Sequence, residues 1–87
     1  MKIKNGFVVR TIAGESVVVA LGEASKNFNG IIKLNDTGRF LWDKLSEDTN
    51  VAELVEAILS EYEVDRETAE ADIERFVSTL GGAGILE

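Results

Sequence analysis

The spacing of apolar residues changes once along this chain of 87 residues, close to residue 35. Before that point, β-branched and other apolar residues alternate or run together in short segments. After it, apolar residues recur every three to four positions. A period of 2 is typical of a β-strand, and a period of about 3.6 is typical of an α-helix. The change therefore predicts strands first and helices second, in an α+β fold.

The first block contains three predicted strands. Residues 7–12 and 16–21 are rich in β-branched side chains, and the turn-forming residues 13–15 separate them. The dipeptide Asn29-Gly30, a strong signal for a tight turn, leads into a third apolar run at residues 31–34. These segments predict a three-stranded antiparallel meander. Because so small a sheet cannot bury both of its faces, the second block must cover one of them.

The second block begins with two predicted helices. The first runs from about residue 37 to residue 45, and either Asn35 or Asp36 is placed to accept the free amide hydrogens of its first turn. The second helix begins at Asn50, whose spacing to Glu53 resembles a capping box. Its apolar residues recur at helical spacing and predict a face that packs on the core. They are Val51, Leu54, Val55, Ile58, Leu59 and Tyr62.

A third helix is predicted to open at Asp65, with Glu67 and Glu70 near its positive N-terminal end. The pair Gly81-Gly82 is expected to stop this helix, and the apolar residues of the tail at 83–87 are expected to fold back on the core. No Pro, internal repeat or low-complexity linker interrupts the order of elements. We therefore expect residues 1–87 to form a single domain.

The composition argues against several classes of function. The chain has no Cys and no His, so disulfides, the usual zinc and iron–sulfur ligands and cysteine or histidine catalysis are not available, and we expect no metal and no cofactor. A net charge of −7, from 16 acidic and 9 basic residues, disfavours nucleic acid as a partner. No apolar run approaches the roughly 20 residues that cross a bilayer, and no signal-type segment follows residues 1–5. We expect a cytoplasmic protein without a membrane partner.

One segment is more specific than the rest. Leu34-Asn35-Asp36-Thr37-Gly38-Arg39-Phe40-Leu41-Trp42 joins a short strand to a helix through a polar cap. It resembles the strand-to-helix junction of the PqqD-like family, the leader-peptide recognition domains of ribosomally made, post-translationally modified peptides. The similarity extends over nearly the whole chain, to Val51-Ala52-Glu53-Leu54-Val55, residues 59–62, Asp72-Ile73, Phe76 and residues 80–86. We interpret Asn35 as a helix cap and Trp42 as a core residue.

The resemblance implies a winged-helix-like packing of the three strands on the three helices, and a binding site for a leader peptide. In the family the leader adds as a further strand beside the third strand and is flanked by the third helix. An open strand edge suits this role, because an extended peptide can pair with its free amide and carbonyl groups. The expected peptide-binding residues are Ile31, Ile32, Lys33 and Leu34 on the strand and Thr68, Ala71, Asp72, Arg75, Ser78 and Thr79 on the helix.

Two details of this site stay open at the level of sequence. Alternation sends Ile32 and Leu34 to one face and Ile31 and Lys33 to the other, without saying which pair faces the peptide. Replacing Ile32 with Pro is predicted to remove a backbone donor that the peptide needs. Arg75 is predicted to pair with a carboxylate of the leader, but it could equally be a solvated residue that pairs with Asp72 one turn earlier.

The resemblance also implies two partners, a precursor peptide held through its leader and a modifying enzyme. That enzyme is often a radical enzyme that uses S-adenosylmethionine and an iron–sulfur cluster. Since this chain has no Cys, it cannot hold such a cluster, and the cofactor would belong to the partner. The chain itself is therefore expected not to be an enzyme, and to supply effective concentration and orientation, as a peptide chaperone does.

Other functions are less well supported by the residues. A winged-helix DNA-binding module would read DNA with its third helix, where acidic residues outnumber arginines and would repel phosphates. An enzyme is disfavoured because no flanking pattern marks a pair of carboxylates, and because Gly81-Gly82-Ala83-Gly84 follows a helix and lacks the ending of a phosphate loop. A generic protein-interaction adaptor of the same fold remains an open alternative, since many adaptors also bind through an edge strand.

Overall fold

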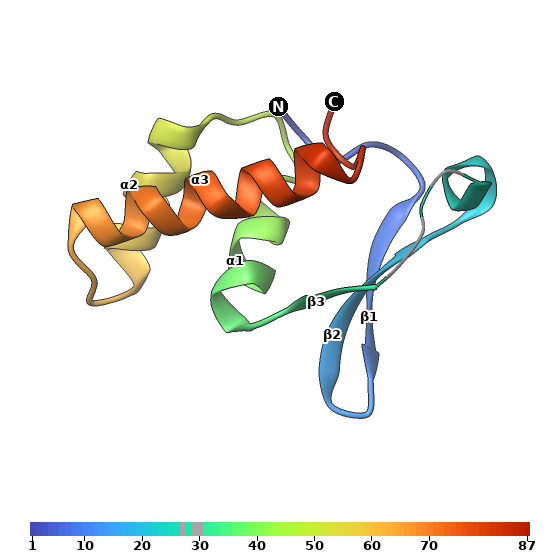
Figure 1. Cartoon of the computed structure of the whole chain (residues 1–87). Coiled ribbons are helices and arrows are strands. Elements are labelled where there is room, and N and C mark those ends of the chain that lie inside the picture. The colour runs from blue at the N-terminus through green and yellow to red at the C-terminus, as the bar shows by residue number, and fades with distance from the viewer. Residues whose placement is uncertain (27, 29–30) are drawn as a thin grey trace.

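The computed structural model describes residues 1–26, 28 and 31–87, and has three strands followed by three α-helices (Figure 1). This confirms the predicted α+β fold with an open antiparallel sheet. A 3-10 helix at Gly22–Lys26, which the sequence did not predict, separates the second and third strands. The predicted Asn29-Gly30 turn lies outside the described residues. The elements are β1 (Phe7–Ile12), β2 (Glu15–Ala20), β3 (Ile32–Leu34), α1 (Asp36–Lys44), α2 (Val51–Glu61) and α3 (Arg66–Gly82).

The sheet has the order β1-β2-β3, with antiparallel pairing throughout. Only two residues, Ala13 and Gly14, connect β1 to β2. Their positive φ angles, 53° and 81°, allow so short a turn. That geometry belongs to the tight hairpin turns whose twist matches the twist of the flanking strands. Glu15, predicted as part of the turn, therefore belongs to β2, where it pairs with Ile12.

Each helix begins at a side-chain cap, and the sequence predicted the caps of the first two and the starting residue of the third. The Gly38 amide donates to Asn35 Oδ1 over 2.8 Å, so Asn35 and not Asp36 caps α1. The Glu53 amide donates to Asn50 Oδ1 over 2.9 Å at the start of α2. The Glu53 carboxylate accepts a hydrogen bond from the Thr49 hydroxyl, so its side chain does not complete the reciprocal half of a capping box. The third cap, Asp65, accepts from the Thr68 amide over 2.7 Å.

The third helix does not stop at Gly81-Gly82, where the sequence had predicted its end. Gly81 and Gly82 are helical, and the chain leaves the helix only at Gly84, whose φ is 75°. The Gly84 amide donates to the Gly81 carbonyl, and the Ile85 amide reaches back to the Leu80 carbonyl over 3.0 Å. This pair of bonds is the Schellman arrangement, in which the left-handed residue defines the end of the helix. Gly81 and Gly82 could not stop α3, because glycine can also take helical angles.

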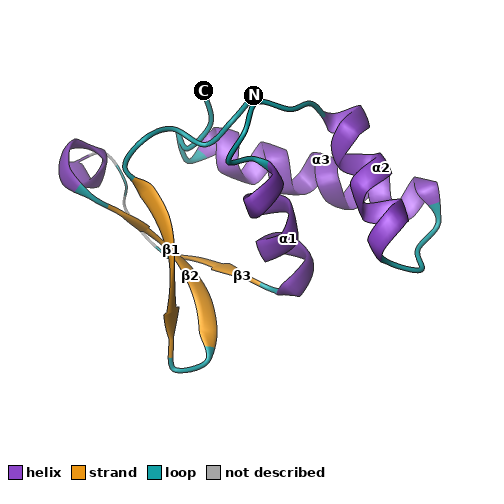
Figure 2. Cartoon of the chain, turned by 180° about the vertical axis from the view of Figure 1, so that it is seen from behind, coloured by secondary structure: helices purple, strands orange, loops and turns teal. Residues whose placement is uncertain are grey.

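The core lies between one face of the sheet and the three helices. Its fully buried members come from every helix and from the tail: Leu41 and Leu45 of α1, Leu54 of α2, Ile73 and Leu80 of α3, Ile85 of the tail, and Val18 of β2. Trp42 is 7 % exposed and belongs to the same cluster, as predicted. The tail does fold back, since Leu86 forms a bridge with Ile3. Both termini lie at the end of the molecule away from the β1–β2 turn (Figures 1 and 2).

Candidate functional site

A groove of about 870 Å³ opens between β3 and the side of α3. The first turn of α1 closes one end of it, where β3 runs into the helix (Figure 2). The floor is apolar and the rim is polar, a combination suited to an extended peptide whose side chains alternate in direction. The lining residues are Gly14, Glu15, Ser16, Ile32, Lys33, Leu34, Asn35, Asp36, Thr37, Gly38, Leu41, Asp72, Arg75, Phe76 and Thr79.

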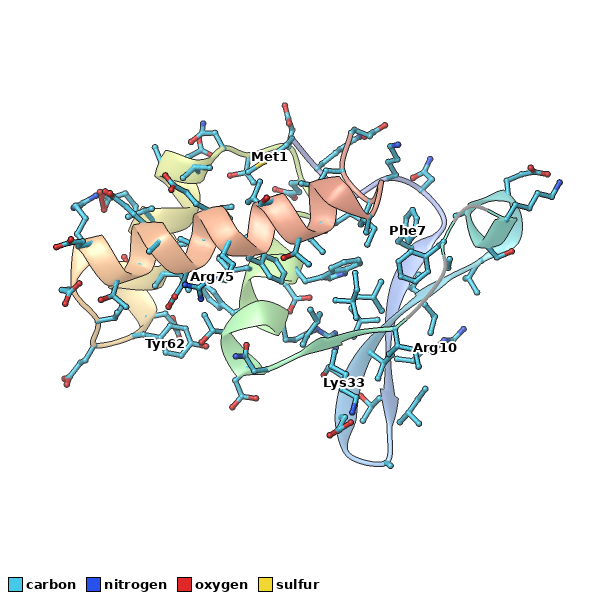
Figure 3. All side chains as sticks on the ribbon, viewed as in Figure 1. Met1, Phe7, Arg10, Lys33, Tyr62 and Arg75 are labelled. Carbon is cyan, nitrogen blue, oxygen red and sulfur yellow. The ribbon has the colours of Figure 1, made fainter. Side chains whose placement is uncertain are left out.

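Six of the ten predicted site residues line this groove. They are Ile32, Lys33 and Leu34 of β3 and Asp72, Arg75 and Thr79 of α3. Figure 3 shows Lys33 on the strand side and Arg75 on the helix side. The three α3 residues recur at intervals of three and four, which places them on one stripe of the helix.

The other four predicted residues are not part of the lining. Thr68 lies one turn nearer the start of α3 than the groove reaches. Ala71 and Ser78 each precede a lining residue by one position, which turns them about 100° around the helix. Ile31 lies just before β3 and its side chain is 72 % exposed. Their contact with a peptide stays a prediction.

Two residues near the floor carry a signal that the sequence prediction did not use. Gly38 is buried in the first turn of α1, and a Cβ added there would lie 3.5 Å from Phe76 Cε1 and 3.2 Å from Asn35 Oδ1. The contact with Phe76 would be an ordinary van der Waals contact, whereas the shorter distance would crowd the side chain of Asn35 that caps α1. Phe76 had been assigned only to the core stripe, but it is half-buried and serves both the core and the groove.

β3 is an edge strand, because only β2 pairs with it among the described residues. The register decides which of its amides face that open edge. Between antiparallel strands, hydrogen-bonded and non-hydrogen-bonded residue pairs alternate. The Leu21 amide donates to the Gly6 carbonyl over 2.7 Å, and a two-residue turn makes its flanking pair, Ile12 and Glu15, hydrogen-bonded. Both observations show that the backbone N–H and C=O groups of the odd-numbered residues of β2 point toward β1.

The even-numbered residues of β2 are left to pair with β3. Ser16 pairs with Leu34 and Val18 with Ile32, so the backbone groups of Ile32 and Leu34 point to β2. The N–H and C=O of Lys33 point instead to the open edge. The expectation that Ile32 offers its amide to a peptide is therefore wrong, and Lys33 takes that place. The side chains of Ile32 and Leu34 lie on the core face of the sheet, toward the groove floor.

Two exposed ion pairs lie on the rim of the groove. Arg75 Nη1 is 3.4 Å from Asp72 Oδ1 on α3, which is the internal pairing that the sequence had left open. Lys33 Nζ is 3.1 Å from Glu15 Oε2 across the sheet. Because all four side chains are more than half exposed, these pairs are weak and can exchange partners. The rim can thus offer either sign of charge to an incoming peptide.

Within residues 1–26, 28 and 31–87, no group of three or more acidic, His or Cys side chains is arranged to hold a metal ion. In the same part of the chain, no helix is both long and apolar enough to span a membrane.

Comparison with known proteins gives the same fold with a peptide partner. A solved structure of TbiB1 in complex with the TbiA(beta) leader peptide is 33% identical, with a TM-score of 0.77, and the match covers 100% of this chain and 95% of that one. A lasso peptide synthetase B1 complexed with the leader peptide is 26% identical, with a TM-score of 0.72 and coverage of 97% and 93%.

A search of curated proteins finds no match. Residues 11–86 match the family model of coenzyme PQQ synthesis protein D. This confirms the resemblance seen at the junction between β3 and α1. Because the match takes in nearly the whole chain, the protein belongs to the family of coenzyme PQQ synthesis protein D (PqqD).

Proposed function

We propose that this protein binds the leader segment of a ribosomally made precursor peptide and presents it to a modifying enzyme. The observation that carries the proposal is the open edge of β3 beside a groove with an apolar floor. Two solved structures with similar folds hold leader peptides, which supports the same class of ligand here.

The leader adds as a strand against Lys33, whose N–H and C=O form the backbone pair. The leader residues on either side of the one opposite Lys33 then place their side chains in the groove between Ile32, Leu34 and Phe76. The backbone pairing demands little of the leader sequence, whereas the apolar floor selects residues that can bury a side chain. The rim pairs at Glu15–Lys33 and Asp72–Arg75 then adjust to the charges of the leader.

The chain itself performs no chemistry in this proposal. A separate modifying enzyme, of the radical S-adenosylmethionine type or another, acts on the core of the same peptide in the cytoplasm. The protein raises the local concentration of the peptide and fixes its direction, which is a contribution of position and not of bond making.

The test is a two-dimensional amide NMR titration of the ¹⁵N-labelled protein with the leader peptide encoded beside it. We expect the largest shifts at Ile32–Leu34 and along the groove side of α3, at Asp72, Arg75 and Thr79. A leader of the same composition in scrambled order is the control, and should give smaller shifts at the same concentration.

Two outcomes would contradict the proposal. The absence of shifts with any precursor peptide encoded near the protein would favour a generic protein-interaction adaptor. This would hold above all if the protein still bound an enzyme encoded nearby. Shifts confined to α2 and to the residues of α3 that do not line the groove would place the ligand elsewhere and would refute strand addition at β3.

A further inference from the structure

Charge is distributed very unevenly between the two halves of this protein. Residues 1–35, which include the sheet, contain five basic and two acidic residues, whereas residues 36–87, which form the helices, contain four basic and fourteen acidic residues. The net charge of −7 is therefore the sum of a basic sheet half and a strongly acidic helical half. A partner that carries acidic groups is attracted to the sheet and repelled by the helices.

The sheet has a second face that the core does not use. Pairing puts Val8 beside Val19, and Arg10, Val17 and Lys33 in one row across all three strands. Residues that pair directly share a face. This outer sheet face consists of Val8, Arg10, Ile12, Glu15, Val17, Val19 and Lys33. None of its apolar members belongs to the core cluster or packs against it in the described part of the chain.

The outer sheet face combines apolar side chains with two cations, Arg10 and Lys33, and one carboxylate, Glu15, which lies 3.1 Å from Lys33 Nζ. Its central residue, Val17, is only 8 % exposed. Ile12 is 55 % exposed, and Leu21 and Ile31, which continue the alternation just beyond the strands, are 46 % and 72 % exposed. Apart from Tyr62, these are the large apolar residues that the described structure exposes. Arg10 extends from β1 away from the helices (Figure 3). Exposed apolar surface bordered by charges is typical of a protein-interaction site.

We infer that the outer sheet face is the docking surface of the modifying enzyme, through an apolar patch on that enzyme bordered by carboxylates. This inference rests on the proposed function. A leader paired with β3 extends the sheet by one strand, and its residue opposite Lys33 has its side chain on the outer face. The enzyme then contacts protein and peptide on one continuous surface, and binds the loaded protein more tightly than the empty one.

Two other occupants fit this face less well. A second copy of the chain, packed face to face, would bring two faces of the same net positive charge together, because each carries Arg10 and Lys33 against one Glu15. An anionic membrane would attract the sheet but repel the fourteen acidic residues of the helical half. An enzyme surface with carboxylates around an apolar centre satisfies both the charge and the exposed apolar residues.

The test uses the double variant Arg10→Glu/Ile12→Thr. Both residues are exposed and neither lines the groove, and Thr keeps the β-branched shape that suits a strand. Lys44→Glu, a charge reversal at an exposed residue of α1, is the matched control. Affinity for the purified modifying enzyme encoded beside the protein is measured by calorimetry, with and without saturating leader, and affinity for the leader is measured separately.

We expect the double variant to bind the enzyme at least about tenfold more weakly while its leader affinity stays within twofold of the wild type, about the scale of an exposed substitution. Saturating leader should tighten enzyme binding by the wild type at least about fivefold. Equal enzyme affinities for wild type and double variant would overturn the inference. Self-association that the double variant abolishes would assign the face to a second copy and would overturn it as well.

These results separate the inference from the proposed function. If the wild type binds no leader, the proposed function is contradicted, and so is the inference that the enzyme prefers the leader-bound protein. A wild type that binds leader, together with a double variant that keeps its full enzyme affinity, refutes the docking surface alone.

Discussion

Replacing Lys33 with Pro should weaken leader binding without unfolding the protein. Proline has no backbone N–H, and the register aims the N–H of Lys33 at the open edge of the sheet. An edge strand tolerates Pro where its N–H would face solvent. The substitution therefore removes the donor that the leader would use, while the bonds between β3 and β2 remain.

The size of the effect follows from the number of bonds lost. One backbone hydrogen bond contributes about 0.5–1.5 kcal/mol net to binding. A carbonyl of the leader that loses its donor in a partly buried groove costs about 1–3 kcal/mol. A loss of about 1–3 kcal/mol corresponds to a leader Kd that is about 5- to 150-fold larger. Isothermal titration calorimetry with the leader measures this change directly.

Two matched variants separate the causes. Lys33→Ala keeps the N–H and removes only the charged side chain, so the ratio of its Kd to that of Lys33→Pro isolates the backbone bond. Ile32→Pro should instead break the ladder with β2 and lower the thermal midpoint of unfolding. If Lys33→Pro unfolds at the wild-type temperature and binds leader as tightly as Lys33→Ala, strand addition at this edge is refuted.

Three further substitutions have clear expected outcomes. Gly84→Ala puts a side chain at a φ of 75° and should lower the free energy of unfolding by about 1–2 kcal/mol in urea denaturation. Arg75→Glu reverses a 76 % exposed charge, so stability should change by less than about 0.5 kcal/mol while leader affinity falls about tenfold; an unchanged Kd would remove Arg75 from the contact. The hydrogen bond from the Thr68 amide lowers the pKa of Asp65 below its ordinary value of 3.8, so the stability that this charge adds is present above that value and is lost as the pH falls through the lower folded pKa. Asp65→Asn should therefore melt with a weaker dependence on pH below about pH 4, and an equal slope in both proteins would contradict this role.

The elements of the fold could be predicted because their signals are local. The caps at Asn35, Asn50 and Asp65 satisfy amides three residues away, and the apolar period of each helix reports the face that it buries. The end of α3 was missed because it depends on Ile85, which must reach the core, and not on Gly81-Gly82 alone. That choice is made by tertiary packing.

The site was predictable only in part for the same reason. Alternation along β3 places Ile32 and Lys33 on opposite faces. The amide that faces the open edge depends both on the register of β3 with β2 and on the β1–β2 register that the Ala13-Gly14 turn sets. The role of Phe76 depends on the position of α3 beside the groove. Neither relation can be read from the spacing of residues within one element.

The shortness of β3 has a kinetic consequence. Within the three residues of β3, only Lys33 directs its backbone N–H and C=O to the open edge. Backbone hydrogen bonds to β3 therefore contribute little to the stability of the bound state. Differences in affinity among related complexes arise mostly in the dissociation rate. A leader bound as proposed therefore has a residence time set by how its side chains fit the groove.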